Sequence, residues 1–415
     1  MNIDRRRFLS GLAALPLCRA VDWHAPPPQA RALILVWLDG GMSHIDMFDG
    51  KPEASPDVRG DLGSVPANLD GVFFGEGLQR LAQRMDRMVL FRAVTHGEGV
   101  HERASEYLLT GHRPSAVLAQ PCFGAVHAMG RDPLAMPAFL AVPDAPPHGG
   151  RGFLDARFAP FELGGDPGRP EYRVHHLTPD PAHTRRQAWR ERLDALDTAR
   201  SVSERARDDF VREARALSLD GEVRQWFDLG AEDARMRSTY GRHRLGQSCL
   251  LARRLVQGGA RCVLVRDDGW DHHRDIRRAL TYGFPPKYEA VDQAISALVD
   301  DLDELGLAER VVVMVASEFG RTPRLNPAGG RDHWPRAQSV LAFGGGFARG
   351  AVVGRTDRKG EEPVDGATTP ADLHATLVRA LGGDVEQVIE TADGRPYPVV
   401  ERGGAPVAAA LRGPR

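Results

Sequence analysis

The chain has 415 residues, of which 42% are hydrophobic and 27% are charged, a balance that allows one large globular core or two smaller ones. Its formal net charge of -2 gives no electrostatic support to a general nucleic-acid-binding role. The four cysteines are far apart and show no Cys-x-x-Cys spacing, which argues against a zinc–thiolate site and against a disulfide framework.

The N-terminal segment has a pattern that is typical of an export signal. Residues 4–20, DRRRFLSGLAALPLCRA, place paired arginines before a short, weakly apolar run, as in a twin-arginine signal. The run is too short to remain as a membrane-spanning helix, and the alternative reading is a basic N-terminus without defined structure. We expect residues 1–30 to be a signal and linker and residues 31–415 to be the folded domain. The twin-arginine machinery would deliver it to the periplasm or the outside, without a stable membrane span.

The first expected strand covers residues 32–38, ALILVWL, an uninterrupted apolar run typical of a strand buried on both faces of a parallel sheet. Asp39 follows it directly, and two glycines then allow a tight turn. A carboxylate in this position is costly unless it is paired or bound to a metal, so we expect Asp39 to be a metal ligand. Ser43, the nearest hydroxyl, is a nucleophile, a contact of metal or substrate, or a loop cap.

The next segment predicts an amphipathic helix over 77–85, a short strand over 88–91, and a second helix over 102–109 that a Thr-Gly pair closes. The start of that second helix presents free N–H groups and the positive end of the helix dipole, which favour an anion. His101 lies where such an anion would bind.

The middle of the chain carries less chemical information. Residues 115–180 are rich in Pro and Gly and predict loops with one strand at 138–142. Residues 181–258 are strongly charged and helical, and most of their charge is typical of a solvated helix face. We expect them to form a helical insertion beside the sheet.

Two later strands again end in polar residues. A strand over 260–265 leads to Asp271 and His273, whose side chains point the same way if the loop is extended. An amphipathic helix over 288–306 then precedes an apolar strand over 311–315, which predicts a βαβ unit.

Beyond residue 315 the chain becomes polar, with Glu318 and Arg321, and a Gly-rich loop then carries Asp332 and His333. A further strand over 339–343 and a helix from Pro370 complete the pattern. Because ligands of open α/β sheets bind beyond the carboxyl ends of the strands, these acids and histidines are expected to share one site. Carboxylate oxygens and imidazole nitrogens suit a divalent cation. The expected ligands are Asp39, Asp271, His273, Glu318, Asp332 and His333.

Several stretches together resemble the alkaline phosphatase/sulfatase superfamily, and specifically its exported, sulfatase-like group that is catalogued only as a domain of unknown function. They cover nearly the whole mature chain: LDGGMSHIDMFD, HERASEYLLTGHRP, GQSCLLARRLVQGGARCVLV, GWDHH, SEFGRTPRLN and GRDHWP. The resemblance implies an α/β fold with a mostly parallel central sheet sandwiched by helices. It also implies a metal-dependent hydrolase of phosphate or sulfate esters, with zinc, calcium, magnesium or manganese as the cofactor.

The resemblance further implies individual roles. Asp39 matches the acid that follows the first strand and holds a metal, and Asp271 with His273 resembles a mid-chain ligand pair. Glu318 falls where the superfamily has the Asp of an Asp-His or Asp-Asn pair, and Phe319 stands where the second member of that pair belongs. His333, with Asp332, is similar to a later ligand histidine.

The nucleophile departs from the superfamily pattern. In sulfatases and related phosphodiesterases a formylglycine, Thr or Ser opens the helix that ends in Leu-Thr-Gly, and here that place holds His101. Three alternatives follow: His101 is a covalent nucleophile or a metal ligand, Ser43 is the nucleophile from another loop, or the metal activates water for direct attack. Arg321 and Arg103 are expected to clamp the anionic group of a small-molecule or glycan ester.

The missing nucleophile also favours a second reading. The chain would then be a catalytically degenerate binding protein that keeps the fold and recognises sulfated glycans or envelope partners. A metal-free scaffold is the third reading.

Overall fold

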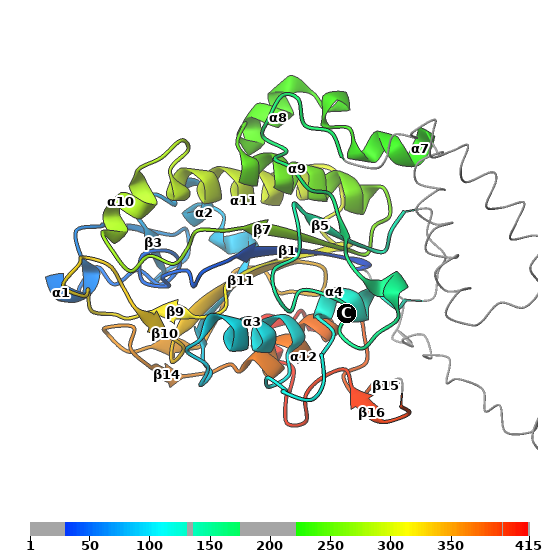
Figure 1. The fold of residues 1–415 in the computed structure, drawn as a ribbon. Helices are drawn as coiled ribbons and strands as arrows, with labels where there is room; N and C mark the ends of the chain where they lie inside the picture. Colours follow the sequence, from blue (N-terminus) through cyan, green and yellow to red (C-terminus); the bar gives the residue numbers. More distant parts are fainter. Residues whose placement is uncertain (1–29, 131–135, 175–220, 392, 414–415) are drawn as a thin grey trace, which may run out of the picture.

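The computed structural model describes residues 30–413 apart from 131–135, 175–220 and 392, so the expected export signal and most of the expected insertion lie outside the described residues. Within these residues the central sheet has eight strands in the order β12-β4-β11-β8-β1-β7-β5-β6 (Figure 1). Only β11 runs antiparallel to its two neighbours, which confirms the expected mostly parallel sheet. The strands of this sheet are β1 (Ala32–Leu38), β4 (Val89–Val94), β5 (Phe139–Val142), β6 (Phe161–Glu162), β7 (Cys262–Asp267), β8 (Val311–Ala316), β11 (Gln338–Gly344) and β12 (Ala351–Val353).

Strand β1 lies at the centre of the sheet and explains its apolar sequence. Its neighbours are β7 and β8, and Ile34 pairs with Val263 on one side and with Val313 on the other. Every residue of β1 is buried, because its side chains alternate between two separate hydrophobic cores. A strand covered on both faces needs no polar alternation, so the uninterrupted apolar run predicts it correctly.

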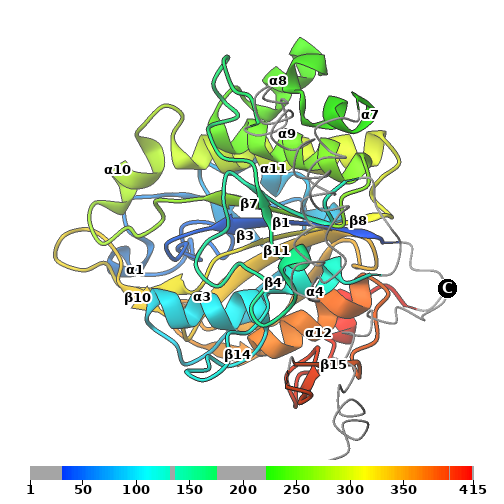
Figure 2. The same cartoon turned by 45° about the vertical axis from the view of Figure 1, so that its right-hand side comes forward.

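Helices cover both faces of the sheet (Figures 1 and 2). On one face α9 and α11 contribute Leu250 and Val291 to the first core. On the other face α3, α4 and α12 contribute Leu108, Phe123 and Leu373 to the second core. The helices are α1 (Pro56–Arg59), α2 (Gln79–Ala82), α3 (His101–Thr110), α4 (Phe123–Ala128), α7 (Gly221–Arg224), α8 (Ala234–Tyr240), α9 (Arg244–Gln257), α10 (Ile276–Thr281), α11 (Lys287–Glu304) and α12 (Pro370–Ala380).

The helix expected over 77–85 is shorter than its pattern predicts. It is α2 followed by a 3-10 turn over Met85–Arg87. The side chain of Asp292, on α11, accepts hydrogen bonds from the backbone N–H groups of Arg80 and Leu81 at 3.2 and 2.8 Å. A carboxylate in this position satisfies donors that a helix start leaves free, so it fixes the start of α2.

Four two-stranded antiparallel ribbons accompany the central sheet in the described residues. The ribbon that matters for the site joins β9 and β10, and it places Arg321 opposite His333 in the strand register. None of the helices in the described part of the chain has the length and apolar character that crossing a membrane requires. The ribbon strands are β2 (Ser64–Pro66), β3 (Phe73–Gly75), β9 (Gly320–Arg321), β10 (His333–Trp334), β13 (Arg355–Thr356), β14 (Pro363–Asp365), β15 (Val388–Glu390) and β16 (Pro396–Pro398).

Candidate metal centre

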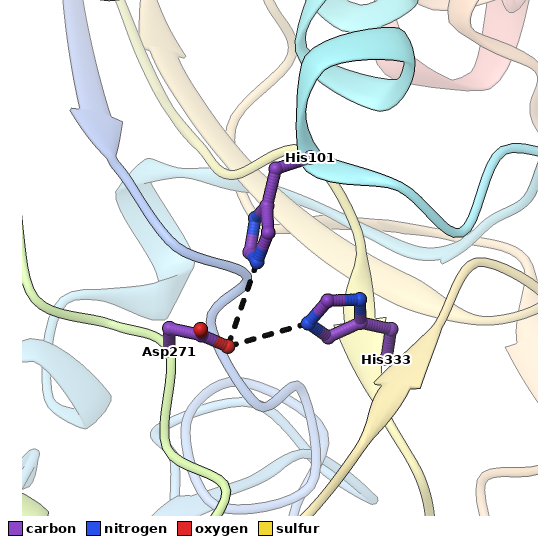
Figure 3. Close-up of side chains that lie close together, drawn as sticks. All are labelled: His101, Asp271 and His333. Atoms are coloured by element: carbon purple, nitrogen blue, oxygen red, sulfur yellow. Dashed lines mark hydrogen bonds and ion pairs between the residues drawn. The ribbon is translucent and has the colours of Figure 1, made fainter.

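Three segments that are far apart in the sequence meet beyond the carboxyl ends of the central strands. The loop after β7 brings Asp271 and His273, the ribbon after β8 brings His333, and the N-terminus of α3 brings His101. Figure 3 shows His101 and His333 both pointing toward the Asp271 carboxylate. This is the edge at which the sequence predicts a site.

The polar atoms converge closely. Oxygen Oδ1 of Asp271 lies 3.0 Å from Nε2 of His273, 3.3 Å from Nε2 of His333 and 3.5 Å from Nε2 of His101. The Nε2 atoms of His273 and His333 are themselves 3.1 Å apart. Possible ligand atoms of His101, Asp271 and His333 all lie within 4.8 Å of one another. One carboxylate oxygen is therefore surrounded by the same nitrogen of three imidazole rings.

The opposite nitrogen of each ring faces an acceptor. Nδ1 of His101 lies 2.7 Å from the Glu318 carboxylate, and Nδ1 of His273 lies 2.7 Å from the Asp332 carboxylate. Nδ1 of His333 lies 2.9 Å from the backbone oxygen of Gly99. Carbonyl and ionised carboxylate oxygens only accept hydrogen bonds, so each ring must donate from Nδ1. In the neutral ring this leaves the lone pair of Nε2 directed at the centre.

This arrangement fits a divalent cation. Three lone pairs and a carboxylate oxygen that face one another repel unless a positive charge lies among them. Imidazole ligands whose second nitrogen donates to a carboxylate or a carbonyl are the usual arrangement around protein metals. Three carboxylates, those of Asp271, Glu318 and Asp332, contact these imidazoles, and one guanidinium, that of Arg321, faces Asp271, so acidic groups outnumber fixed cations at the centre.

Arg321 is part of the support of the centre. Its side chain is fully buried, and its terminal nitrogen donates to Oδ1 of Asp271 at 2.5 Å. Its other N–H groups donate to backbone oxygens, including that of Gly41 at 2.7 Å. Burial alone would raise the pKa of Asp271, but the hydrogen bond and charge of Arg321 outweigh it and hold that pKa at about 2. The sequence predicts Arg321 as a clamp for substrate, whereas its donors are already used inside the protein.

Phe319 forms an apolar wall beside the histidines. It is fully buried, and its ring centroid lies 5.0 Å from that of His101 and 4.5 Å from that of His333. Gly41, at φ +81°, approaches this ring so closely that a Cβ atom there would lie 2.3 Å from it. The residue that departs from the superfamily pattern thus packs against two of the imidazoles.

Two other residues that the sequence marks make different side-chain contacts in the described part of the chain. Asp39 forms an ion pair at 2.7 Å with Arg266 on the adjacent strand β7. Ser43 is buried and donates to the Asp46 carboxylate at 2.5 Å, so its hydroxyl acts as a loop contact.

Glu318 and Asp332, both expected as ligands, instead contact the outer nitrogens of His101 and His273. Glu318 is completely buried and also accepts from the backbone N–H of Gly40 at 3.0 Å. Arg103, the second expected clamp, pairs with Glu98 on the surface at 2.6 Å. The role of Gly99 was not predicted, because a backbone carbonyl leaves no signal in the sequence.

The centre is open to solvent on one side. The side chains of Asp271 and His273 are 47% and 41% exposed, whereas those of His101 and His333 are 33% and 25% exposed. The hydrogen bond to Glu318 raises the pKa of His101, although its partial burial opposes this. The centre is therefore accessible from solvent, while two of its supporting residues, Glu318 and Arg321, are completely buried.

The mixed α/β fold and this edge site define a protein with a large, mainly parallel central sheet and a candidate metal centre beyond the carboxyl ends of its strands. The chain belongs to the family described as "Protein of unknown function (DUF1501)", whose match covers residues 30–411. No curated protein matches the chain.

Several solved structures are similar to the chain at low identity and low TM-score. The PsFucS1 sulfatase from Pseudoalteromonas sp. is 11% identical, with a TM-score of 0.38 over 86% of this chain and 68% of that chain. The lipoteichoic acid synthase LtaP from Listeria monocytogenes is 9% identical, with a TM-score of 0.38 over 92% and 89%. Alkaline phosphatase from the Antarctic bacterium TAB5 is 9% identical, with a TM-score of 0.34 over 85% and 98%.

Proposed function

We propose that this chain is a metal-dependent hydrolase of phosphate or sulfate esters, with one divalent cation held by His101, Asp271, His273 and His333. The observation that carries the proposal is the convergence of three Nε2 atoms on Oδ1 of Asp271, while each Nδ1 faces an acceptor. The class of ester rests on the sequence resemblance to the alkaline phosphatase/sulfatase superfamily. Of the four cofactors considered, zinc suits an imidazole-rich set best, since calcium and magnesium prefer oxygen ligands.

Three residues around the centre orient and support the proposed ligands. Glu318 and Asp332 hold the rings of His101 and His273 in orientation and keep their protons on Nδ1. Arg321 keeps the Asp271 carboxylate ionised and fixed. A bound divalent cation would act as a Lewis acid on the ester and make water a stronger nucleophile. The exposed sides of Asp271 and His273 leave room for the ester.

The place of action follows from the N-terminal sequence. The paired arginines and the short apolar run of residues 4–20 support export of the folded protein through the twin-arginine pathway. The substrate would then be a small-molecule or glycan ester in the periplasm or outside the cell.

A metal and turnover assay on matched variants tests the proposal. The purified full chain is analysed for metals and assayed on a panel of aryl phosphates and aryl sulfates, beside His273→Ala and His272→Ala. His272 is the matched control because it neighbours both Asp271 and His273 but bonds to the Gly269 carbonyl at 3.0 Å. We expect metal and turnover in the wild type and in His272→Ala, and loss of both in His273→Ala. Turnover that survives complete metal removal would contradict the proposal.

A second candidate is a binding protein that keeps the metal and lacks catalysis. It is favoured by two contacts: Ser43 is bonded to Asp46, and Arg321 is buried with its donors used. Neither of these two predicted catalytic groups is thus offered to a substrate. Stoichiometric metal without turnover of any aryl ester, together with retention on a column of sulfated glycan, would favour this candidate over the hydrolase.

A further inference from the structure

A second polar pocket lies near the short ribbon of β13 and β14. Its volume is about 690 Å³, and four basic residues line it: Lys51, Arg92, Arg355 and Arg358. They come from the loop after β1, from strand β4 near one edge of the central sheet, and from β13 and the loop that follows it. None of these four residues belongs to the metal centre, so the proposed function does not account for the basic lining of this pocket.

The floor of the pocket carries more positive than negative charge. One buried carboxylate, Asp49, accepts from Nζ of Lys51 at 3.0 Å and from the Thr356 hydroxyl at 2.5 Å. The same Asp49 lies 3.5 Å from Nε of Arg92. A single acid therefore faces two cations whose side chains are only 13% and 14% exposed. This leaves an excess positive charge in a poorly hydrated place.

The guanidinium of Arg92 is the unusual group. It carries five N–H donors, yet within the described residues its contact is the ion pair with Asp49, which is too long and too poorly aligned to be a hydrogen bond. Its Nε is buried without a hydrogen-bond partner. A mostly buried donor without an acceptor is costly, and a bound ion or molecule is a common reason for one.

Arg355 and Arg358 extend the positive charge to the rim of the pocket. Both are exposed, so a ligand can approach them from solvent. Two further acids line the pocket, Glu53 and Asp357, so four cations face three carboxylates. Glu53 is exposed, and Oδ1 of Asp357 accepts from the backbone N–H groups of Lys359 and Glu361 at 3.0 and 2.8 Å. The cations approach from several elements, so a ligand that meets them needs acceptor oxygens in several directions.

We propose that this pocket binds a tetrahedral oxyanion, a phosphate or sulfate group. Such a group has oxygens directed to several sides, which a planar carboxylate lacks, and guanidinium groups recognise it through paired hydrogen bonds. The inference goes beyond the proposed function, because binding here needs neither a metal nor turnover. The oxyanion is either free or a second anionic group of the ester.

The pocket and the metal centre share a structural connection. The loop between β13 and β14 accepts a hydrogen bond at its Glu361 carbonyl from Nε1 of Trp334, at 2.8 Å. Trp334 follows His333 directly on β10. One loop thus borders the pocket and also contacts the strand that carries a residue of the centre.

Calorimetric titration with inorganic phosphate and inorganic sulfate tests the proposal. It uses the full chain carrying His333→Ala and kept in chelator, so that the metal centre cannot contribute. We expect saturable binding that Arg92→Gln weakens at least about tenfold, which corresponds to about 1.4 kcal/mol and is what the loss of one charge-assisted hydrogen bond costs. The exposed pair Arg355→Ala/Arg358→Ala, which has little effect on folding, should weaken binding several-fold. Arg402→Ala, an exposed arginine outside the pocket, is the matched control and should bind as the parent does.

Absence of saturable binding, or binding that neither set of pocket variants changes, overturns the proposal. A second arm distinguishes the two sources of the oxyanion in metal-loaded protein with His333 intact. If Arg92→Gln raises KM only for an aryl ester that carries a second anionic group, the pocket serves the substrate. The comparison substrate is the same aryl ester without the second anionic group. If Arg92→Gln leaves KM unchanged for both esters while it weakens the binding of inorganic anion, the pocket takes a free oxyanion. Because the first arm needs no turnover, it remains informative even if the chain is not a hydrolase.

Discussion

Two acidic residues that follow neighbouring strands of one sheet have different surroundings. Asp39 comes directly after β1, and its carboxylate pairs with Arg266 at 2.7 Å. Asp271 lies in the loop after β7, and its Oδ1 faces three imidazole nitrogens in addition to Arg321. From the sequence alone Asp39 was as strong a candidate for a metal ligand as Asp271.

The difference teaches that an acid at a strand end is a weaker candidate for a metal ligand than an acid on which imidazole nitrogens converge. A guanidinium on the adjacent strand neutralises Asp39 locally, whereas Asp271 is surrounded by lone pairs that a single guanidinium does not satisfy. Convergent imidazoles with acceptors on their outer nitrogens are therefore the stronger sign of a metal site.

The largest expected effect separates these two acids. Asp271→Ala should abolish stoichiometric metal binding, with a loss of affinity greater than the roughly 10–100-fold that removal of an outer hydrogen-bond partner costs. Asp39→Ala should retain one metal per chain. Metal titration of the chelator-treated variants checks both. Equal loss in the two variants would break the comparison and make Asp39 a member of the centre.

An intermediate effect is expected at Glu318, which contacts Nδ1 of His101 at 2.7 Å. Glu318→Gln removes the charge but keeps the size of the side chain, so metal affinity should fall by about 10–100-fold. Asp332→Asn offers a matched comparison at His273, because that carboxylate makes the same contact at 2.7 Å but is exposed. Competition with a chromogenic chelator measures both. Unchanged affinity in both variants would contradict a supporting role for the two carboxylates.

The pH dependence of metal binding follows from His101. Its contact with Glu318 raises its pKa, so in the metal-free protein a proton on its ring persists to higher pH than on an ordinary histidine. The proton and the metal compete for the ring, so affinity should fall about tenfold per pH unit for each proton displaced, once pH drops below that raised pKa. In Glu318→Gln the fall should begin at lower pH. A flat affinity profile across the histidine range would exclude His101 as a ligand.

The contact between His101 and Glu318 also determines how the stability of the metal-free protein changes with pH. A histidine whose folded pKa is raised stabilises the fold below its unfolded pKa, and this contribution is lost as pH rises through the folded pKa. Metal-free protein should therefore lose part of its stability as pH rises through that value, and Glu318→Gln should not. Thermal unfolding in chelator at a series of pH values measures this contribution. A stability that rises over this window in wild type alone would contradict the assigned sign.

The smallest effect on the centre is expected at Arg266. Arg266→Met leaves Asp39 partly buried without its partner, which should cost about 1–2 kcal/mol in the free energy of unfolding. Metal stoichiometry should stay unchanged, because within the described residues the side chains of this pair contact each other, Trp37 and Asp144. Urea unfolding and metal analysis of the same sample check the two parts together. Loss of metal without loss of stability would contradict the separation of the two regions.

The sequence predicts the scaffold better than the details of the site. The apolar runs of β1 and β8 and the amphipathic pattern of α11 predict a buried parallel sheet covered by helices, because burial on both faces leaves a plain mark in the sequence. The edge at which Asp271, His273 and His333 meet could also be predicted, since parallel strands end on the same side.

The remaining details could not be predicted because they depend on pairings across the fold. The Arg266 partner of Asp39 depends on strand register, and the Gly99 carbonyl at His333 depends on how a loop lies. Glu318 has the composition of a ligand, and only its distance to His101 indicates a supporting contact. Motif spacing carries none of this information.

The most direct test of the account is the metal content of the purified full chain by elemental analysis. Because three imidazoles and one carboxylate converge on a single point, we expect one divalent ion per chain, and zinc when it is available. We expect His333→Ala to lose this ion. A wild-type chain that stays below a tenth of an equivalent of any divalent metal after dialysis against each of the four candidates would contradict it.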